Sequence, residues 1–159
     1  MLRTVRYISY PDIDESRQMD LPVFDPLGSE KNLKILQSKS NLVAYLESHP
    51  LPWTDGEYYS ITAEKQYQLS SKIMAATMAQ TLSEDYHLTW NSTGEVCKEW
   101  TLSDLSALAF SIDARVTALV TYQQTKEVEI RNAETQEALD AIVVDYDTVP
   151  VPQLPEVSQ

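Results

Sequence analysis

The sequence predicts an α+β fold that is mostly α-helical, with about four helices, one β-hairpin and a C-terminal antiparallel helical hairpin. Three observations support this class. Apolar residues recur at intervals of three and four along several stretches, as in helices with one buried face. Apolar and polar residues alternate over about residues 86–100, on both sides of a loop that contains Gly94, which is typical of a β-hairpin. No Gly or Pro stands between Glu95 and Val149, which favours long helices.

The chain of 159 residues is long enough for one domain with a hydrophobic core. Three Pro residues before Gly28 break any helix, so residues 1–28 are expected to form an extended N-terminal arm. Residues 29–148 are expected to form the helical domain. Residues 149–159 contain three Pro and are expected to form an extended tail.

Two helices are expected before the hairpin. The first spans residues 29–48, with Ser29 as its N-terminal cap. The second begins after the cap Thr62 and runs to about residue 83. Between them, Asp55-Gly56 predicts a tight turn followed by a short extended piece. On the first helix the expected apolar face is Leu33, Leu36 and Val43, with Ile35, Leu42 and Leu46 adjoining. On the second helix it is Leu69, Ile73, Ala76 and Leu82, with Met74 and Met78 alongside.

The hairpin over residues 86–100 is expected to carry alternating side chains on one face of each strand. These are Tyr86, Leu88 and Trp90 on the first strand and Val96, Lys98 and Trp100 on the second. Cys97 then lies in the middle of the second strand, where a buried structural thiol is the common case. Two strands alone are only marginally stable, so we expect the hairpin to pack on the helices.

Residues 101–147 are expected to form two antiparallel helices. Thr101 caps the first helix, which runs to about Asn132. Its apolar face is expected to contain Leu105, Leu108, Ile112, Val116 and Leu119. Thr135 caps the second helix. The apolar face of that helix is expected to contain Leu139, Ile142, Val143 and Tyr146.

The composition is strongly acidic, with 24 Asp and Glu against 12 Lys and Arg and a formal net charge of −12. The charge becomes more negative along the chain, with net values of −1, −4 and −7 over residues 1–50, 51–100 and 101–159. A surface this acidic repels phosphate backbones, so we expect no nucleic-acid partner. The same charge attracts a basic protein partner.

The single cysteine, Cys97, excludes an internal disulfide framework and indicates a reducing compartment. The first residues lack the apolar segment of a secretory signal. The most apolar stretch, residues 106–122, is interrupted by Asp113 and Arg115, so no membrane-spanning segment is expected.

Few residues of this chain suit catalysis or metal binding, so we expect neither an enzyme nor a cofactor. The only His are His49 and His87, and no pair of candidate ligands has the spacing of a helix-face metal site. Cys97 and His87 both lie on the predicted hairpin, which leaves a Cys–His dyad open. Paired carboxylates are expected to be solvated. These pairs are Asp12/Asp14, Glu84/Asp85, Glu127/Glu129 and Asp145/Asp147.

Aromatic residues are the candidates for a partner-binding surface, because they contribute much of the binding energy at protein interfaces. The candidates are Trp53, Trp90, Trp100 and Tyr122. Trp90 and Trp100 flank the predicted hairpin, where an aromatic pair also serves as core. Both interpretations stay open.

The hairpin segment LTWNSTGEVCKEW, residues 88–100, contains a Trp-Asn…Trp pattern. A long helix, Gln123-Gln124, a second helix from Glu137 to Tyr146 and a Pro-containing end follow it. This order over residues 86–155 resembles the C-terminal half of tail-fibre assembly proteins of tailed bacteriophages. The resemblance implies a small, acidic, non-enzymatic chaperone of the receptor-binding fibre. It also implies a location in the host cytoplasm during assembly, or in the virion where such a protein stays on the fibre tip.

The resemblance leads us to expect a phage accessory protein that binds and caps a tail-fibre or baseplate polypeptide, with Trp90 and Trp100 as anchors. Two alternatives stay open. One is an acidic nucleic-acid mimic that inhibits a host defence enzyme. The other is a small enzyme that uses Cys97. An extended amphipathic helical hairpin rarely covers all of its own apolar face, so a homo-oligomer, a dimer through the long helix, is a further expectation.

Overall fold

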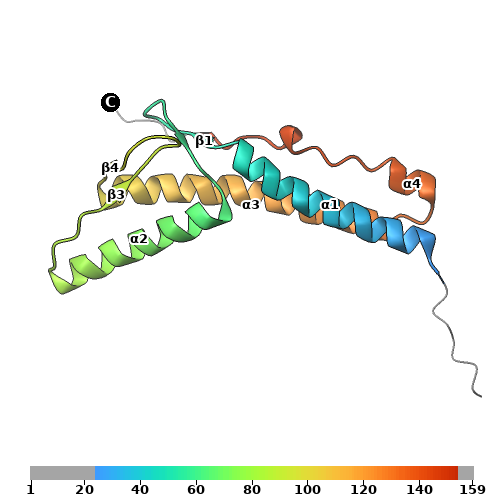
Figure 1. Cartoon of the computed structure of the whole chain (residues 1–159), viewed down its shortest axis with the longest axis horizontal. Helices are drawn as coiled ribbons and strands as arrows, with labels where there is room; N and C mark the ends of the chain where they lie inside the picture. The colour runs from blue at the N-terminus through green and yellow to red at the C-terminus, as the bar shows by residue number, and fades with distance from the viewer. Residues whose placement is uncertain (1–23, 154–159) are drawn as a thin grey trace, which may run out of the picture.

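A computed structural model describes residues 24–153 of the chain (Figure 1). These residues form four α-helices, two pairs of short antiparallel strands and one 3₁₀ turn, so the α+β, mostly helical class is confirmed. The elements are α1 (Pro26–Ser48), β1 (Leu51–Pro52), β2 (Tyr58–Tyr59), α2 (Ala63–Leu82), β3 (Thr89–Trp90), β4 (Lys98–Glu99), α3 (Leu102–Asn132), α4 (Gln136–Asp140) and η2 (Tyr146–Thr148).

The 31-residue helix α3 forms the spine of an elongated molecule (Figure 1). Helices α1 and α2 lie nearly end to end along it, α1 beside the C-terminal half of α3 and α2 beside the N-terminal half. Both run antiparallel to α3. At one end of the α1 contact the Lys31 ammonium donates to the Arg131 carbonyl at 3.0 Å, and at the other end the Arg115 guanidinium donates to the Tyr45 hydroxyl at 3.2 Å.

Helix α1 begins at Pro26, so the expected start at residue 29 and the cap Ser29 were wrong. Asp25 is the cap, because its carboxylate accepts from the Gly28 N–H at 2.9 Å and Pro26 needs no amide partner in the first turn. Residues 24–28 of the expected arm therefore begin the folded structure, while residues 1–23 of the arm lie outside the described residues.

The expected apolar face of α1 was also wrong. Leu33, Leu36 and Val43 are more than half exposed. The face that packs on α3 contains Ser38 and the residues expected to adjoin that stripe, Ile35, Leu42 and Leu46. Ser38 belongs to this face because its hydroxyl accepts from Gln123 of α3 at 3.1 Å, a contact between residues 85 positions apart.

The expected cap and the expected bounds of α2 are confirmed. The Thr62 hydroxyl accepts from the Lys65 N–H at 3.3 Å. Leu69 and Ala76 are buried against α3, as expected, and Ile73 packs beside them. The expectation was wrong for Leu82, Met74 and Met78, which are more than half exposed. The helix ends in a left-handed residue, Ser83, with φ 57°.

The hairpin expected over residues 86–100 is present but its ladder has two residues on each strand, β3 and β4. Cys97 and Val96 lie in the loop before β4 and are exposed, which corrects the expectation of a buried thiol in mid-strand. The Asn91 side-chain amide donates to the Glu95 carbonyl at 3.1 Å. This side-chain contact takes the place of a backbone ladder bond, so residues 91–97 form a loop and not an extension of the strands. A second pair, β1 with β2, forms around the expected Asp55-Gly56 turn.

Helix α3 confirms the cap Thr101, whose hydroxyl accepts from the Asp104 N–H at 3.0 Å. Leu105, Leu108, Ile112 and Leu119 are buried, as expected. By length and composition α3 is apolar enough to cross a membrane, contrary to the expectation from the sequence. Only 28% of its most apolar 18-residue stretch is buried.

The second arm of the expected C-terminal helical hairpin is much shorter than residues 135–147. Thr135 is the cap, as expected, but α4 ends at Asp140. Ile142, Val143 and Val144 follow, and β-branched residues disfavour a continuing helix. The chain instead returns antiparallel to α3 as residues 141–153, here called the strap (Figure 1).

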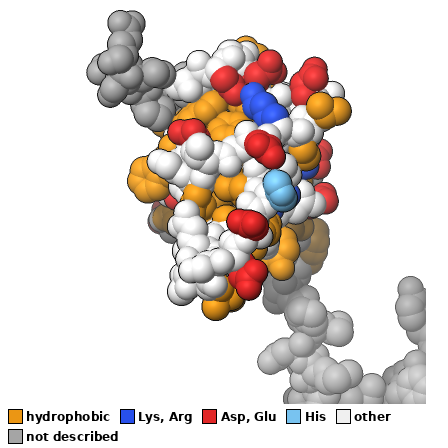
Figure 2. Space-filling model, turned by 90° about the vertical axis from the view of Figure 1, so that its left-hand side faces the viewer, with side chains coloured by type: hydrophobic (Ala, Val, Ile, Leu, Met, Phe, Trp, Pro, Cys, Tyr) orange, Lys and Arg blue, Asp and Glu red, His pale blue; other side chains and the backbone are white. Residues whose placement is uncertain are grey.

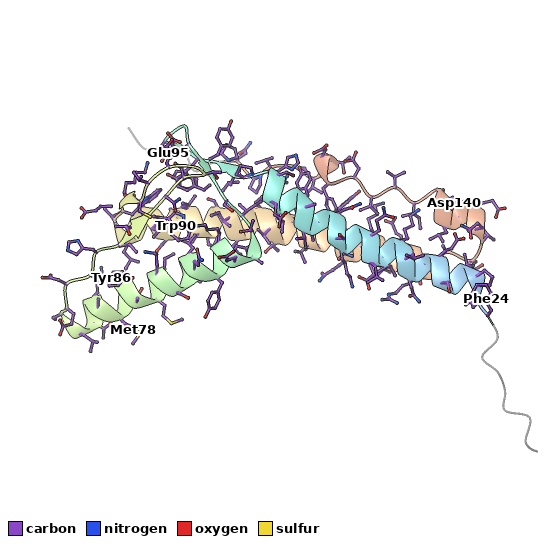
Figure 3. All side chains as sticks on the ribbon, viewed as in Figure 1. Phe24, Met78, Tyr86, Trp90, Glu95 and Asp140 are labelled. Atoms are coloured by element: carbon purple, nitrogen blue, oxygen red, sulfur yellow. The ribbon has the colours of Figure 1, made fainter. Side chains whose placement is uncertain are left out.

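The strap is held by hydrogen bonds to a backbone carbonyl of α1 and to side chains of α3. The Tyr146 hydroxyl donates to the Ser38 carbonyl at 2.7 Å, and the Arg115 guanidinium donates to the Val149 and Pro150 carbonyls at 2.8 and 3.0 Å. At the far end, Asp140 of α4 and Phe24 before α1 lie at the same end of the molecule (Figure 3). There the Gln136 amide donates to the Glu30 carboxylate at 2.6 Å.

Candidate functional site

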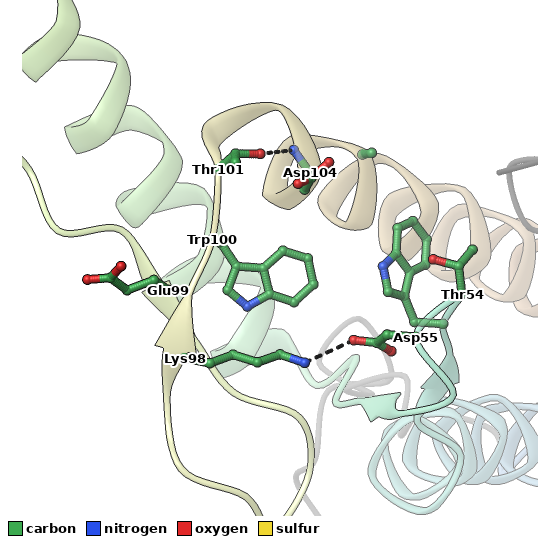
Figure 4. Close-up of a pocket in the computed structure, with 9 residues that line it drawn as sticks. Thr54, Asp55, Lys98, Glu99, Trp100, Thr101 and Asp104 are labelled. Atoms are coloured by element: carbon green, nitrogen blue, oxygen red, sulfur yellow. Dashed lines mark hydrogen bonds and ion pairs between the residues drawn. The ribbon is translucent and has the colours of Figure 1, made fainter. Parts of the chain in front are cut away.

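A hollow in the described residues lies where the two hairpins meet the start of α3 (Figure 4). It has a volume of about 370 Å³, within the usual range for small binding sites. We call it the Trp53–Trp100 cleft. The side chains that matter for its chemistry are Trp53, Asp55, Lys98, Glu99, Trp100 and Asp104.

The β1–β2 turn positions Trp53 and Asp55. The backbone N–H of Trp53 donates to the Glu57 carbonyl at 2.9 Å, and the backbone N–H of Gly56 donates to the Trp53 carbonyl at 3.1 Å. Gly56 has φ +82°, which an L side chain rarely adopts, so Gly is required there. The Asp55 carboxylate also accepts from the Glu57 N–H at 3.0 Å. The short sequence Trp-Thr-Asp-Gly therefore sets both an aromatic wall and a carboxylate of the cleft.

Lys98 reaches into the cleft from β4. Its ammonium donates to Asp55 Oδ2 at 3.1 Å and lies 5.6 Å from the centre of the Trp100 ring (Figure 4). This hydrogen bond to Asp55 raises the pKa of Lys98. Burial acts to raise the pKa of Asp55, but hydrogen bonds from Tyr59, the Glu57 N–H and Lys98 outweigh it and hold that pKa below its usual value. Both groups are therefore charged at neutral pH.

Tyr59 supports the floor of the cleft from beneath. Its hydroxyl donates to Asp55 Oδ2 at 2.7 Å, and its ring meets the Trp100 ring edge to face at a centroid distance of 5.6 Å. Burial, together with the hydrogen bond to Asp55, raises the pKa of Tyr59 to about 12. The backbone N–H of Trp100 donates to the Leu88 carbonyl at 2.9 Å and fixes the position of this residue. Among the described residues, the buried Trp100 Nε1 has no hydrogen-bond partner.

The cleft carries excess negative charge. Asp55, Glu99 and Asp104 line it against the single ammonium of Lys98. At the end of the molecule that includes the β3–β4 hairpin, hydrophobic side chains gather in the middle and acidic side chains stand around them (Figure 2). Indole faces attract cations, and adjacent carboxylates strengthen this attraction. The arrangement therefore suits a cationic side chain.

Two of the four aromatic candidates meet in this cleft and two do not. Trp90 is 3% exposed and belongs to the core, with the Lys65 ammonium 5.1 Å from its ring centre. Tyr122 lies on α3, where its hydroxyl accepts from the Asp145 N–H of the strap at 3.1 Å. In this structure Trp90 and Tyr122 therefore hold the fold together. Trp53 is 9% exposed and is also part of the core, although it lines the cleft, so the partly exposed candidate is Trp100.

The residues considered for catalysis are dispersed. Cys97 is exposed, and no hydrogen bond joins it to His87 in the described part of the chain. His87 Nδ1 lies 3.4 Å from Glu99 Oε1 instead. Within residues 24–153 no group of three or more His, Cys, Asp or Glu is placed to hold a metal ion. Asp12 and Asp14 lie outside the described residues.

Of the carboxylate pairs, Glu127/Glu129 contains a group with a strongly shifted pKa. Glu127 accepts from Arg131 at 2.6 Å, from Lys39 at 2.9 Å and from the Gln123 amide at 3.3 Å. These hydrogen bonds, Arg131 first, lower the pKa of Glu127 from 4.5 to about 2. Its role is to tie α1 to α3, because Lys39 lies on α1.

The depressed pKa of Glu127 makes the fold acid-sensitive in a defined range. Its contribution to the free energy of unfolding is present above pH 4.5 and is lost as the pH falls from 4.5 toward 2. We expect Glu127→Gln to be less stable than the unmodified chain at pH 7, with the difference shrinking toward pH 2. Urea unfolding at pH 7, 5, 4 and 3 measures this difference. The exposed Glu134→Gln is the control, and a Glu127→Gln deficit independent of pH contradicts the assignment.

Sequence reasoning missed the charged members of the cleft. Asp55 was interpreted only as a turn residue and Asp104 only as part of a helix cap. Asp55 and Lys98 are 43 positions apart, so only folding brings them together. A local signal does exist, since an Asp-Gly turn closely following a Trp places a carboxylate beside an indole ring.

No protein-family model matches this chain, and no match was found among curated proteins or among solved structures. A functional proposal for this chain draws on the geometry of the cleft, the surface charge and the sequence.

Proposed function

We propose that this protein binds a polypeptide partner by accepting a Lys or Arg side chain of that partner in the Trp53–Trp100 cleft. One observation carries the proposal. The protein's own Lys98 already places an ammonium 5.6 Å from the Trp100 ring centre and 3.1 Å from the Asp55 carboxylate. The cleft therefore accommodates a cation in contact with an aromatic face.

The cleft has capacity for a second cation. Lys98 pairs with Asp55, while within the described residues Glu99 and Asp104 form no ion pair with Lys or Arg. A partner's guanidinium or ammonium at these carboxylates brings the local charge closer to balance and adds a contact to the indole faces. Arg is the better fit, because its planar group stacks on a ring while it donates to carboxylates.

The whole surface favours a basic partner. The net charge of −12 raises the encounter rate with a positively charged segment. The hydrophobic centre of the end face, bordered by acidic side chains in Figure 2, is an arrangement that protein interfaces commonly have. These features support a binding protein more than an enzyme.

We propose that the partner is a tail-fibre or baseplate polypeptide of a phage and that this chain is an accessory protein of its assembly. The support is the resemblance of residues 86–155 to tail-fibre assembly proteins in the hairpin, the long helix and the Pro-containing end; the second long helix of that order is replaced by the short α4 and the strap. On this proposal the protein acts in the host cytoplasm during assembly, caps an exposed segment of the fibre and needs no cofactor. The proposed anchor is the partly exposed Trp100, with Trp53 as the buried wall of the cleft beside it, since Trp90 does not line the cleft.

The test is isothermal titration of the full chain with the fibre polypeptide encoded beside its gene. We expect binding at micromolar concentration, and the double variant Glu99→Gln/Asp104→Asn to bind at least tenfold more weakly. The loss arises because both carboxylates of the open side of the cleft become neutral. Glu99 and Asp104 are exposed, so the fold is retained, which circular dichroism verifies.

The matched control is Glu57→Gln/Glu95→Gln. It removes the same charge from two exposed residues of the hairpin loops that do not line the cleft. We expect it to bind within threefold of the unmodified chain. Equal losses for the two double variants reject the cleft as the site, and no binding to the fibre polypeptide at micromolar concentration rejects the proposed partner.

A nucleic-acid mimic that inhibits a defence enzyme is the second candidate, and the net charge of −12 favours it. Such a mimic requires many carboxylates distributed over the surface, not a single cleft. Its affinity for a nucleic-acid-binding enzyme falls by orders of magnitude between about 50 and 200 mM salt, as for phosphate contacts. Binding that changes less than tenfold over that range rejects this candidate.

A further inference from the structure

Lys98 reaches into the Trp53–Trp100 cleft from the solvent side. Its side chain is 52% exposed, whereas the Asp55 side chain with which it pairs is 30% exposed. Its ammonium donates to Asp55 Oδ2 at 3.1 Å and lies 5.6 Å from the centre of the Trp100 ring (Figure 4). An exposed ion pair stabilises a fold only slightly, because water solvates both charges and the long side chain loses rotamer freedom. The Lys98 side chain therefore leaves Asp55 at little cost to the fold.

Asp55 stays in place without Lys98, because other parts of the fold hold its carboxylate. The Tyr59 hydroxyl donates to Asp55 Oδ2 at 2.7 Å, and the backbone N–H of Glu57 donates to Asp55 Oδ1 at 3.0 Å. Tyr59 is fully buried and the Glu57 N–H belongs to the turn, so neither donor depends on Lys98. Hydrogen bonds of this kind favour the ionised carboxylate. When Lys98 withdraws, Asp55 is therefore a preformed anion, and Oδ2 has an acceptor position that Lys98 no longer fills.

The position that Lys98 fills suits a partner's cation better than the position beside Glu99. Asp55 is fixed by its donors, and the Trp100 ring lies next to the same position. The Glu99 side chain is 80% exposed, and its carboxylate lies 3.4 Å from His87 Nδ1. Solvent screens a charge as exposed as that of Glu99, so a cation is attracted more strongly to Asp55. Lys98 and a cation that enters the cleft therefore compete for the same carboxylate.

We propose that the partner's Arg enters the cleft by exchange, so that its guanidinium takes the place of the Lys98 ammonium on Asp55 and beside the Trp100 ring. Glu99 and Asp104 attract the incoming cation, and the Lys98 side chain moves out to solvent. A guanidinium suits this position because it donates through two N–H groups while its plane stacks on the ring. In the free protein Lys98 is an internal competitor, which lowers the apparent affinity in proportion to its occupancy of Asp55. This inference rests on the proposed function of the cleft and identifies Lys98 as the residue that sets its affinity.

Nuclear magnetic resonance of the full chain with ¹³C-labelled lysine observes the exchange directly. The probe is the peptide acetyl-Gly-Arg-Gly-amide, added up to about 20 mM, since one side chain alone binds weakly. In the free protein the Trp100 ring current displaces the ε-methylene signal of Lys98, whose ammonium lies 5.6 Å from the ring centre. We expect this signal to move to the position of a solvent-exposed lysine as the peptide binds, while the Trp100 indole N–H signal reports the binding itself. Lys65 is the matched control, because it lies 5.1 Å from the Trp90 ring centre and does not line the cleft, and its signal is expected to stay unchanged.

Two substitutions of Lys98 separate competition from a general effect of charge. Lys98→Met vacates Asp55 and is expected to raise the affinity for the peptide by about twofold or more. Lys98→Arg keeps the charge but fills the position with a better occupant, so it is expected to lower the affinity by about twofold or more. Lys65→Met is the matched control, because it removes the same charge from beside a Trp ring outside the cleft, and its affinity is expected to equal that of the unmodified chain.

The outcomes distinguish the exchange from the function on which it rests. Binding that shifts the Trp100 indole signal but leaves the Lys98 signal in place overturns the exchange and retains the cleft as a cation site. An affinity of Lys98→Arg equal to that of the unmodified chain also overturns the exchange, because the charge of Lys98 then acts without its occupying Asp55. If neither signal moves up to the highest peptide concentration, the cleft accepts no cation, and the proposed function is rejected together with the exchange.

Discussion

Arg115→Met is expected to lower the free energy of unfolding by about 3 kcal/mol, because it removes a buried guanidinium that holds the strap. Arg115 is 5% exposed and donates to the carbonyls of Val149 and Pro150 and to the Tyr45 hydroxyl. Met fills a similar volume but leaves the two carbonyls without this donor. For a chain of this size the midpoint of thermal unfolding then falls by about 10 °C. Thermal and urea unfolding, followed by circular dichroism, measure both quantities.

The geometry of Arg115 also predicts that lysine does not restore the stability that arginine provides at this position. One terminal nitrogen reaches both strap carbonyls while the other reaches Tyr45, which a single ammonium does not reproduce, so Arg115→Lys is expected to remain at least about 1 kcal/mol less stable than the unmodified chain. Arg131→Met is the matched control. Arg131 forms an exposed ion pair within α3, and its loss is expected to cost less than about 1 kcal/mol. An Arg115→Met variant as stable as Arg131→Met refutes the role of Arg115 in holding the strap.

Local signals predicted the helices well where a cap residue marks their beginning. Thr62, Thr101 and Thr135 each accept from the backbone N–H three residues later, as the sequence indicates. Such caps depend on a few neighbouring residues, so they are visible without knowledge of the fold. The start of α1 was missed because Pro26 and Gly28 looked like helix breakers, although Pro is well accommodated in a first turn.

The buried face of α1, the strap and the cleft depend on contacts between residues far apart in the sequence, so local patterns did not predict them. Helix α1 has two apolar stripes, and a polar residue, Ser38, determines which one is buried. Its hydroxyl meets Gln123 and its carbonyl accepts from Tyr146, residues 85 and 108 positions away. The same Tyr146 contact helps to hold the strap in place of the expected long second helix. The cleft has the same origin, since the ion pair of Lys98 with Asp55 joins two hairpins.

Asp55→Ala is expected to lower the free energy of unfolding by about 3 kcal/mol, because one carboxylate satisfies three donors. It accepts from the Tyr59 hydroxyl at 2.7 Å, the Glu57 N–H at 3.0 Å and the Lys98 ammonium at 3.1 Å. Tyr59 is fully buried in the intact structure, so its hydroxyl loses this acceptor once Asp55 is gone. The Lys98 pair is partly exposed and contributes less than the other two contacts.

A double-mutant cycle isolates the contact that joins the cleft to the core. Tyr59→Phe is expected to cost about 1.5 kcal/mol, and Asp55→Ala/Tyr59→Phe to cost less than the sum of the single changes by at least about 1 kcal/mol. The combined variant is less costly than the sum because it leaves no buried hydroxyl without an acceptor. Asp55→Ala/Lys98→Met provides the comparison, with an expected coupling below about 0.5 kcal/mol. A larger coupling of Asp55 to Lys98 than to Tyr59 means that the ion pair, rather than the buried hydroxyl, holds the turn against the core.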